Sequence, residues 1–334
     1  MQTTAAAIFV FLLVILLHEL GHFTVAKLVG IKVNEFSVGM GPKIIQKEKG
    51  ETKYTLRILP IGGYVSMEGE DEESQDPRSF GEASPLSRMA VIAAGSFMNF
   101  ILAIVVLSIV AFSIGEPTTI ISETIVDSPA EMVGIMPGDK IVKIDDNKVD
   151  DWDDLSNSIK NANTDEDINV YLIRNGEEKL SVLRPIMKNG ENMIGIVPKH
   201  QKSLIYGIKG GIQQTGMFIK LMFEFVAMTF KGQVSTNDLA GPVGVINEVG
   251  KAAKMGYTNL LLLLGFISVN LGFFNLLPIP ALDGSRLVFI AIELIRGKPI
   301  NADKENFIHM IGFMLLIILM LVVTYKDLFR LNIF

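Results

Sequence analysis

The chain has 334 residues, 49% of them hydrophobic, and a mean hydropathy of +0.40, which excludes an ordinary soluble enzyme. Its formal net charge of −6, without any basic run, argues against a nucleic-acid partner. The sequence contains no cysteine, so nothing depends on a disulfide and any metal ion must be held by His, Asp or Glu.

Four apolar stretches without charged side chains mark the candidate membrane spans. Roughly 20 helical residues cross the hydrocarbon core of a bilayer, and each stretch is close to that length. We expect the first to be a span and not a signal peptide, because no positive segment precedes it and no small-x-small cleavage site follows it. The predicted spans cover about residues 4–28, 89–114, 259–277 and 307–325.

The first span carries His18-Glu19-Leu20-Gly21-His22, an H-E-x-x-H motif. Residues four apart lie on one face of a helix, so both imidazoles can bind one metal ion while Glu19 reaches a water molecule beside it. A helix can carry two histidines by accident, but these three side chains are costly to bury in lipid without partners. We therefore predict Zn²⁺ as the cofactor, with His18 and His22 as ligands and Glu19 as general base.

The segment after the first span is predicted to contain a membrane-associated β-hairpin region. Residues 33–38 and 54–59 alternate as strands do, and Pro60-Ile61-Gly62-Gly63 is typical of a turn. The acidic stretch 67–76 is expected to be a flexible, solvated linker. In the second span, the small residues at 93–96 would let another helix approach closely.

Residues 116–198 have the pattern of one small soluble domain inserted between spans. Strands are predicted at 141–144, 168–173 and 179–183, one polar helix at 152–161, and turns at 137–139 and 175–176. Residues 199–258 then form a linker. Within it, 216–230 is apolar but carries Lys220 and Glu224, so it is either a fifth span or an amphipathic helix in the membrane interface.

Asp283 is the predicted third ligand, because it follows the long apolar run of the third span. Pro278 and Pro280 cannot continue a regular helix, and irregular backbone at membrane depth is tolerated only inside protein or beside a wet cavity. The alternative is that the prolines merely end a helix and Asp283 caps the next one at Ser285.

A topology argument joins these ligands. If the first span runs inward, His18 and His22 lie near its inner end, roughly 20 Å from Thr4 at 1.5 Å per residue. The second span returns outward, the insert lies outside, and the third span runs inward to end at Asp283. A fifth span at 216–230 would place Asp283 on the opposite side, so the zinc site favours four spans.

Basic residues partly support this orientation. Short inner loops should be rich in Lys and Arg, and residues 27–88 and 286–304 both carry several. Lys326 and Arg330, at the outer C-terminus, fit less well. The predicted regions are 1–115 (first two spans with a re-entrant β-hairpin loop), 116–198 (α+β domain), 199–258 (interfacial helix and linker) and 259–334 (last two spans).

The His18 to His22 motif and the run Asn275 to Gly284, which contains Asp283, are together highly specific, and here the sequence resembles the site-2 protease family. The resemblance covers nearly the whole chain and is strongest to the bacterial branch that cleaves membrane-bound anti-sigma factors. Residues 36–42 resemble the family's Gly-Pro region, 60–65 its membrane-dipping hairpin loop, and 94–100 its Gly-Pro-x-x-Asn-Phe, with Ser96 in place of proline. Residues 128–130 and 134–141 resemble a single bacterial PDZ domain.

The resemblance implies a four-span intramembrane zinc endopeptidase that performs regulated intramembrane proteolysis. Its partners would be the lipid bilayer and single-span membrane proteins, such as anti-sigma factors or remnant signal peptides. It would reside in the bacterial plasma membrane, with the active site near the cytoplasmic side and the PDZ-like domain outside. That domain would act as a size filter or tether, and residues 193–196 would form either its peptide-binding edge or an ordinary closing strand.

The resemblance also implies roles for residues other than the ligands. Asn275 would hydrogen-bond the substrate backbone or the developing oxyanion, and Asn270 either assists or packs between helices. The hairpin, with Gly62, Gly63 and Tyr64, would hold an unwound substrate by strand pairing, or serve only for packing.

Two other functions fit the sequence less well. A catalytically silent membrane PDZ scaffold that binds membrane-protein tails is disfavoured, because Glu19, Asn275 and the three ligands are all present. A membrane-anchored zinc protease that cuts loops is disfavoured by the depth of His18. Of the remaining histidines, His200 is expected at the surface and His309 in the interface or between helices. The sequence gives no oligomeric state.

Overall fold

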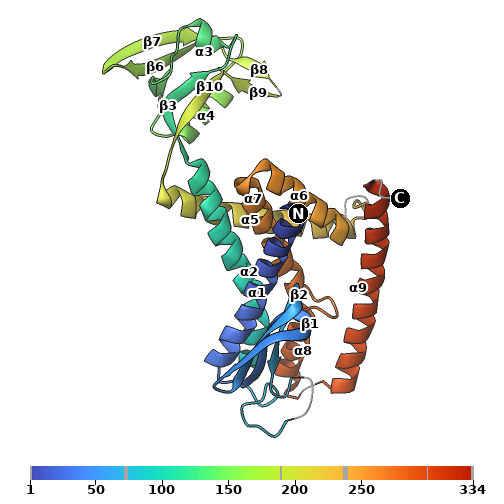
Figure 1. The fold of residues 1–334 in the computed structure, drawn as a ribbon. Coiled ribbons are helices and arrows are strands. Elements are labelled where there is room, and N and C mark those ends of the chain that lie inside the picture. Colours follow the sequence, from blue (N-terminus) through green and yellow to red (C-terminus); the bar gives the residue numbers. More distant parts are fainter. Residues whose placement is uncertain (1, 71–73, 189, 236–239, 299, 332–334) are drawn as a thin grey trace. The chain divides into compact units, whose positions relative to one another are not determined.

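The computed structural model describes residues 2–70, 74–188, 190–235, 240–298 and 300–331 (Figure 1). It divides into two compact units. The helical unit comprises Met1–Val110 and Ile208–Phe334, and the inserted unit comprises Ala111–Gly207, a range that contains the predicted domain 116–198.

The helical unit is built from seven helices and a two-stranded sheet within the described residues. They are α1 (Gln2–Leu28), β1 (Val33–Lys49), β2 (Thr52–Met67), α2 (Pro85–Ile114), α5 (Leu204–Phe230), α6 (Pro242–Met255), α7 (Tyr257–Leu276), α8 (Asp283–Arg296) and α9 (Ala302–Arg330), with α2 and α5 each reaching the border of the inserted unit.

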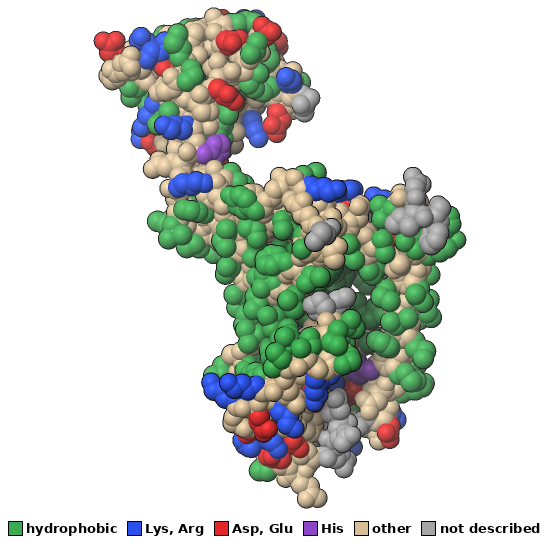
Figure 2. Space-filling view, in the orientation of Figure 1, with side chains coloured by type: hydrophobic (Ala, Val, Ile, Leu, Met, Phe, Trp, Pro, Cys, Tyr) green, Lys and Arg blue, Asp and Glu red, His purple; other side chains and the backbone are tan. Residues whose placement is uncertain are grey.

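Four helices in the described part of the chain are long and apolar enough to cross a membrane: α1, α2, α7 and residues Asp303–Arg330 of α9. They coincide with the four predicted spans, and α5 is not among them. Figure 2 shows hydrophobic side chains covering the middle of the helical unit, with Lys, Arg, Asp and Glu gathered toward its ends. This distribution suits a bundle surrounded by lipid.

Local signals in the sequence set the ends of the first two spans. Gly30, at φ 86°, follows α1, and its N–H donates to the Lys27 carbonyl oxygen, so a residue without Cβ ends the helix. Pro85 begins α2, where its missing N–H is harmless, and Ser84 Oγ accepts from the Ser87 N–H as an N-cap.

Buried apolar side chains join α1 to its neighbours. Val10 and Val14 of α1 pack with Leu102 of α2, Val249 of α6 and Leu264 of α7. Small residues allow the closest approaches, because a Cβ on Gly21 of α1 would collide with the Ala94 carbonyl of α2. The expected close helix contact at residues 93–96 of α2 is therefore made with α1.

The hairpin region has one turn more than predicted. β1 and β2 are joined at Gly50 and Glu51, a turn that was not predicted. The chain also reverses at the predicted turn 60–63, because residues 53–56 run parallel to 35–38 of β1 whereas 63–66 run antiparallel to them. Gly62, at φ 85°, lies within this reversal. Residues 35–38 of β1 pair with 53–56 and also with 63–66, so both edges of this part of β1 are occupied.

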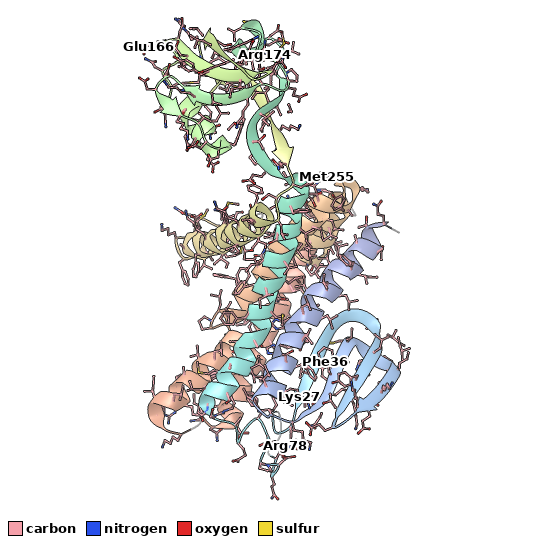
Figure 3. All side chains as sticks on the ribbon, turned by 90° about the vertical axis from the view of Figure 1, so that its left-hand side faces the viewer. Lys27, Phe36, Arg78, Glu166, Arg174 and Met255 are labelled. Atoms are coloured by element: carbon pink, nitrogen blue, oxygen red, sulfur yellow. The ribbon has the colours of Figure 1, made fainter. Side chains whose placement is uncertain are left out.

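The acidic stretch after β2 is not a free linker where it is described. Lys32 Nζ lies 3.2 Å from Glu68 Oε2 and 3.1 Å from Asp76 Oδ2. Nearby, Lys27 and Arg78 both pair with Glu51, at 2.7 and 2.8 Å, and Figure 3 labels these two basic residues at the same end of the helical unit. Residues 71–73 lie outside the described part.

The inserted unit is an α+β domain with one main sheet. The strand order is β10-β3-β4-β6-β7, with β5 added beside β4 and a separate pair β8-β9. Its elements are β3 (Glu116–Thr124), α3 (Pro129–Met132), β4 (Lys140–Ile144), β5 (Asn147–Lys148), α4 (Trp152–Lys160), β6 (Ile168–Arg174), β7 (Glu177–Leu183), β8 (Ile186–Lys188), β9 (Glu191–Met193) and β10 (Ile196–Gln201).

One buried ion pair ties the sheet of this unit to the loop before β4. Asp139 is 1% exposed, and Arg174 at the end of β6 donates to both of its oxygens, at 2.7 and 2.6 Å. Burial works to raise the pKa of the Asp139 carboxyl, but the hydrogen bonds from Arg174 and the Met136 N–H outweigh it and hold this pKa below its usual value.

Candidate metal centre

Helix α1 presents the three side chains of the H-E-x-x-H motif toward the protein interior. His18 and His22 lie one turn apart and are 8% and 9% exposed, so both imidazoles are buried inside the bundle. Glu19 is partly buried beside them. Lipid offers no partners to such groups, and they must therefore be satisfied within the protein.

Asp283 reaches the same place from the other end of the chain. α7 ends at Leu276, the prolines keep the next residues out of helix, and Asp283 is the first residue of α8. The N-cap of α8 is Leu282, with no side-chain cap hydrogen bond, so the alternative of Asp283 as a helix cap is wrong. Ala281 has φ 75° and donates its N–H to Nδ1 of His309, on α9, at 3.1 Å. His309 thus packs between helices and braces the loop before Asp283.

The three predicted ligand atoms face one another. Asp283 Oδ2 lies 3.1 Å from His18 Nε2 and 3.4 Å from His22 Nε2, and the two Nε2 atoms are 3.2 Å apart. Ligand atoms around a tetrahedral zinc ion, with bonds of roughly 2.0–2.2 Å, are about 3.3–3.5 Å apart. Asp283 Oδ2 is buried, and no donor in the described residues is aligned to it. Two nitrogens and one oxygen at this spacing fit Zn²⁺.

No other cluster of His, Asp or Glu in the described part of the chain is compact enough to hold a metal ion. The structure therefore brings together the three ligands predicted from sequence, and His309 is not one of them.

Polar groups of α2 contact the far nitrogens of both imidazoles. His22 Nδ1 lies 2.9 Å from the Val91 carbonyl oxygen, which can only accept, so Nδ1 donates and Nε2 keeps its lone pair for a metal. His18 Nδ1 lies 3.3 Å from Nδ2 of Asn99. Sequence reasoning missed both contacts. A backbone carbonyl leaves no signature in a sequence, whereas a buried asparagine in an apolar span was a usable signal.

The hairpin passes directly beside Glu19. A Cβ on Gly63 of β2 would lie 3.3 Å from Glu19 Cγ and 2.8 Å from the Ser37 carbonyl oxygen. Gly63 therefore leaves the space in which the Glu19 side chain lies. Tyr64, the next residue, is held differently, because its hydroxyl lies 2.5 Å from an Arg57 nitrogen that also pairs with Glu35 at 2.9 Å.

The remaining predicted residues lie on α7 and β2. Asn275 is in the last turn of α7, partly buried, and its amide makes no hydrogen bond within the described residues, which leaves it available. Asn270 donates to the Phe266 carbonyl oxygen of its own helix at 3.0 Å. A Cβ on Gly62 would meet the Met40 side chain at 3.1 Å. The contacts of these residues do not test their predicted roles.

Comparison of the sequence with known proteins identifies the family of this chain. The model of peptidase family M50 matches residues 6–319. The chain belongs to peptidase family M50. A relative from Clostridium acetobutylicum, named a putative zinc metalloprotease, is 43% identical, and the match covers 96% of both chains. The zinc metalloprotease RasP of Geobacillus kaustophilus is 31% identical, covering 98% of each.

Another relative is the regulator of sigma-W protease RasP of Bacillus subtilis, which is 31% identical over a match that covers 99% of each chain. Among solved structures, a PDZ domain of an SdrC-like protein from Listeria monocytogenes matches 25% of this chain and 87% of its own, at 21% identity and a TM-score of 0.21. The full-length matches and the four apolar helices identify this M50 peptidase as a multi-pass membrane protein.

Proposed function

We propose that this M50 peptidase is an intramembrane zinc endopeptidase that cleaves single-span membrane proteins within their apolar segments. The observation that carries the proposal is the convergence of His18, His22 and Asp283, next to Glu19, inside helices apolar enough to span a bilayer. A metallopeptidase that cut only soluble loops would have no need to bury these ligands among such helices.

His18, His22 and Asp283 would hold the zinc ion. When bound, zinc supplies Lewis-acid activation of a water molecule and of the scissile carbonyl. Glu19 then accepts a proton from the attacking water as the C–O bond forms, and passes it to the amine nitrogen as the C–N bond breaks. The free amide of Asn275 is suited to donate a hydrogen bond to the oxygen of the scissile carbonyl.

The β1–β2 hairpin could hold an unwound substrate segment as an added strand. A helix must unwind before its peptide bonds are accessible, and an extended segment needs partners for its backbone groups in a membrane. Residues 63–66 of β2 pair with β1 along one edge, and none of the described strands pairs with the other edge. A substrate strand added there would lie beside Glu19, with Asn270 and the Gly62–Gly63–Tyr64 segment as further contacts.

The inserted unit would act outside the membrane as a PDZ-like size filter or tether. Its support is the motif at residues 128–141 together with the α+β fold. The active site would then lie near the cytoplasmic side of the bacterial plasma membrane, with α5 in the outer interface. The name of the Bacillus subtilis relative, regulator of sigma-W protease, supports a membrane-bound anti-sigma factor as one substrate, and remnant signal peptides are another.

The test compares purified wild type with Glu19→Gln in detergent, using a model single-span substrate and a zinc determination. Wild type should cut within the apolar segment, Glu19→Gln should cut at least about a hundredfold more slowly, and both should hold about one zinc per chain. Zinc in both proteins without cleavage by either would favour a membrane scaffold. A folded wild type without zinc would overturn the metal site.

A further inference from the structure

The two predicted histidine ligands differ in what their second ring nitrogen contacts. His22 Nδ1 faces the Val91 carbonyl oxygen, which can only accept a proton. His18 Nδ1 faces the side-chain amide of Asn99, which can donate through nitrogen or accept through oxygen. A backbone carbonyl therefore fixes the tautomer of His22, whereas the tautomer of His18 depends on the side chain of Asn99.

A metal ligand needs a definite tautomer. A neutral imidazole has one N–H, and the Nε2 lone pair of His18 is free for a metal only if the proton is on Nδ1. That Nδ1–H then needs an acceptor, because an unpaired buried donor is expensive. If Asn99 instead donated to Nδ1, the proton would be on Nε2 and would point at Asp283 Oδ2, 3.1 Å away, in the place of the metal.

Either amide atom of Asn99 can face His18 Nδ1, depending on the orientation of its side-chain amide. Asn99 is fully buried, and its Nδ2 lies 3.3 Å from His18 Nδ1 while its Oδ1 has no hydrogen-bond partner among the described residues. A half-turn about the Cβ–Cγ bond exchanges the two amide atoms and places Oδ1 opposite His18 Nδ1.

We propose that Asn99 is a positioning residue that accepts a hydrogen bond from His18 Nδ1 through Oδ1, and so fixes His18 as a zinc ligand. The inference rests on the proposed metal site and adds to it a residue that touches neither metal nor substrate.

Helix α7 holds Asn99 in register for this role. Ser268 Oγ of α7 donates to the Asn99 carbonyl oxygen at 2.7 Å, in the fully buried interface. One turn later, a Cβ on Gly272 would lie 2.9 Å from the Ser96 carbonyl oxygen and 3.3 Å from Asn99 Cβ, so the two helices touch at this point. These contacts hold the backbone of Asn99 in place, and its side-chain amide is available to hydrogen-bond His18 Nδ1.

The experiment measures zinc affinity of the purified full-length chain in detergent, by competition with a chromophoric chelator. Asn99→Leu and Asn99→Ala remove the acceptor, and each should weaken zinc binding about 10- to 100-fold, the usual effect of losing such a partner. Asn99→Asp has about the same shape and carries only acceptors, so it should keep zinc affinity within about threefold of wild type or tighten it. Asn259→Leu is the matched control, because the exposed Asn259 of α7 donates only to the carbonyl oxygen of Met255, the last residue of α6.

The outcomes separate this inference from the metal site itself. If Asn99→Asp loses zinc as Asn99→Leu does, the amide acts as a donor and the inference is wrong. It is equally wrong if Asn99→Leu and Asn99→Ala bind zinc like wild type. Gel filtration and thermal unfolding check the fold, and should the apolar variants not fold, Asn99→Asp alone decides. Wild type without zinc would instead refute the proposed function.

Discussion

Gly95 of α2 lies against the imidazoles of His18 and His22, the proposed zinc ligands on α1. A Cβ at this position would collide with His22 Nε2 and would lie 2.7 Å from His18 Cε1. The glycine is therefore required by the site and not only by the packing of two helices. Its neighbour Ser96, which differs from the proline expected from the family pattern, touches no ligand.

We expect Gly95→Ala to lower zinc affinity at least about tenfold, because the added methyl group must push the ligand nitrogens out of position. Gly216→Ala on α5 is the control, since nothing lies within 4 Å of a Cβ there. Zinc titration of both purified variants checks this. Equal zinc affinity in Gly95→Ala and Gly216→Ala would show that the imidazoles can move without harm.

At the scale of residues, the sequence was informative where chemistry is carried by side chains in a fixed spacing. The i, i+4 histidines and an aspartate after an apolar run were enough to predict a cluster that the structure brings together. Val91 and Asn99 were not assigned to the site, and Gly63 was expected to contact substrate but not to lie against Glu19, because these contacts arise from how α2 and β2 cross α1. Such contacts depend on tertiary packing, which no local pattern records.

At the scale of elements, the spans and the turn at 60–63 were predicted, but the turn at Gly50 and Glu51 was not. Long apolar runs in lipid have few alternatives to a helix, so the spans were recognised. The turn at 60–63 was recognised because Pro-Ile-Gly-Gly is a strong turn signal, whereas the turn at Gly50 and Glu51 was missed because it lies among charged residues. Strand β3 was not predicted, although it pairs with β10 from Thr124 to Glu116. The strand predicted at 193–196 is divided, because β9 ends at Met193 and β10 begins at Ile196.

The Arg174–Asp139 pair gives the inserted unit a pH-dependent stability. Because the pKa of Asp139 is lowered in the fold, its contribution is complete above the unfolded pKa, roughly 3.9, and is lost as pH falls through the lower folded value. Arg174→Met should therefore destabilise the unit strongly at pH 7 and much less near pH 3.

Urea unfolding followed by Trp152 fluorescence measures this effect in the whole chain, because Trp152 is the single tryptophan and packs on the core of the inserted unit. The control is Arg184→Met, whose partner Asp167 is 55% exposed and whose loss should change the urea midpoint little. A midpoint shift in Arg174→Met that is the same at both pH values would contradict the assignment.

At the scale of the whole molecule, the proposed sidedness can be tested cleanly because the chain has no cysteine. Glu48 of β1 and Glu178 of β7 are exposed and belong to different units. In intact cells, a membrane-impermeant maleimide should label Glu178→Cys at once and Glu48→Cys only after permeabilisation. Labelling of both from the same side would rule out the proposed topology.

The proposed metal centre has a consequence for how much the segment between its ligands can change in length and sequence. The proposed ligands come from the first and the next-to-last helices, so a bound ion would act as a cross-link that closes one very long loop, with the inserted unit inside it. The entropy of closing such a loop grows only with the logarithm of its length. Enlarging, shortening or exchanging the inserted unit should therefore leave metal affinity nearly unchanged, which allows this domain to diversify while the active site stays constant.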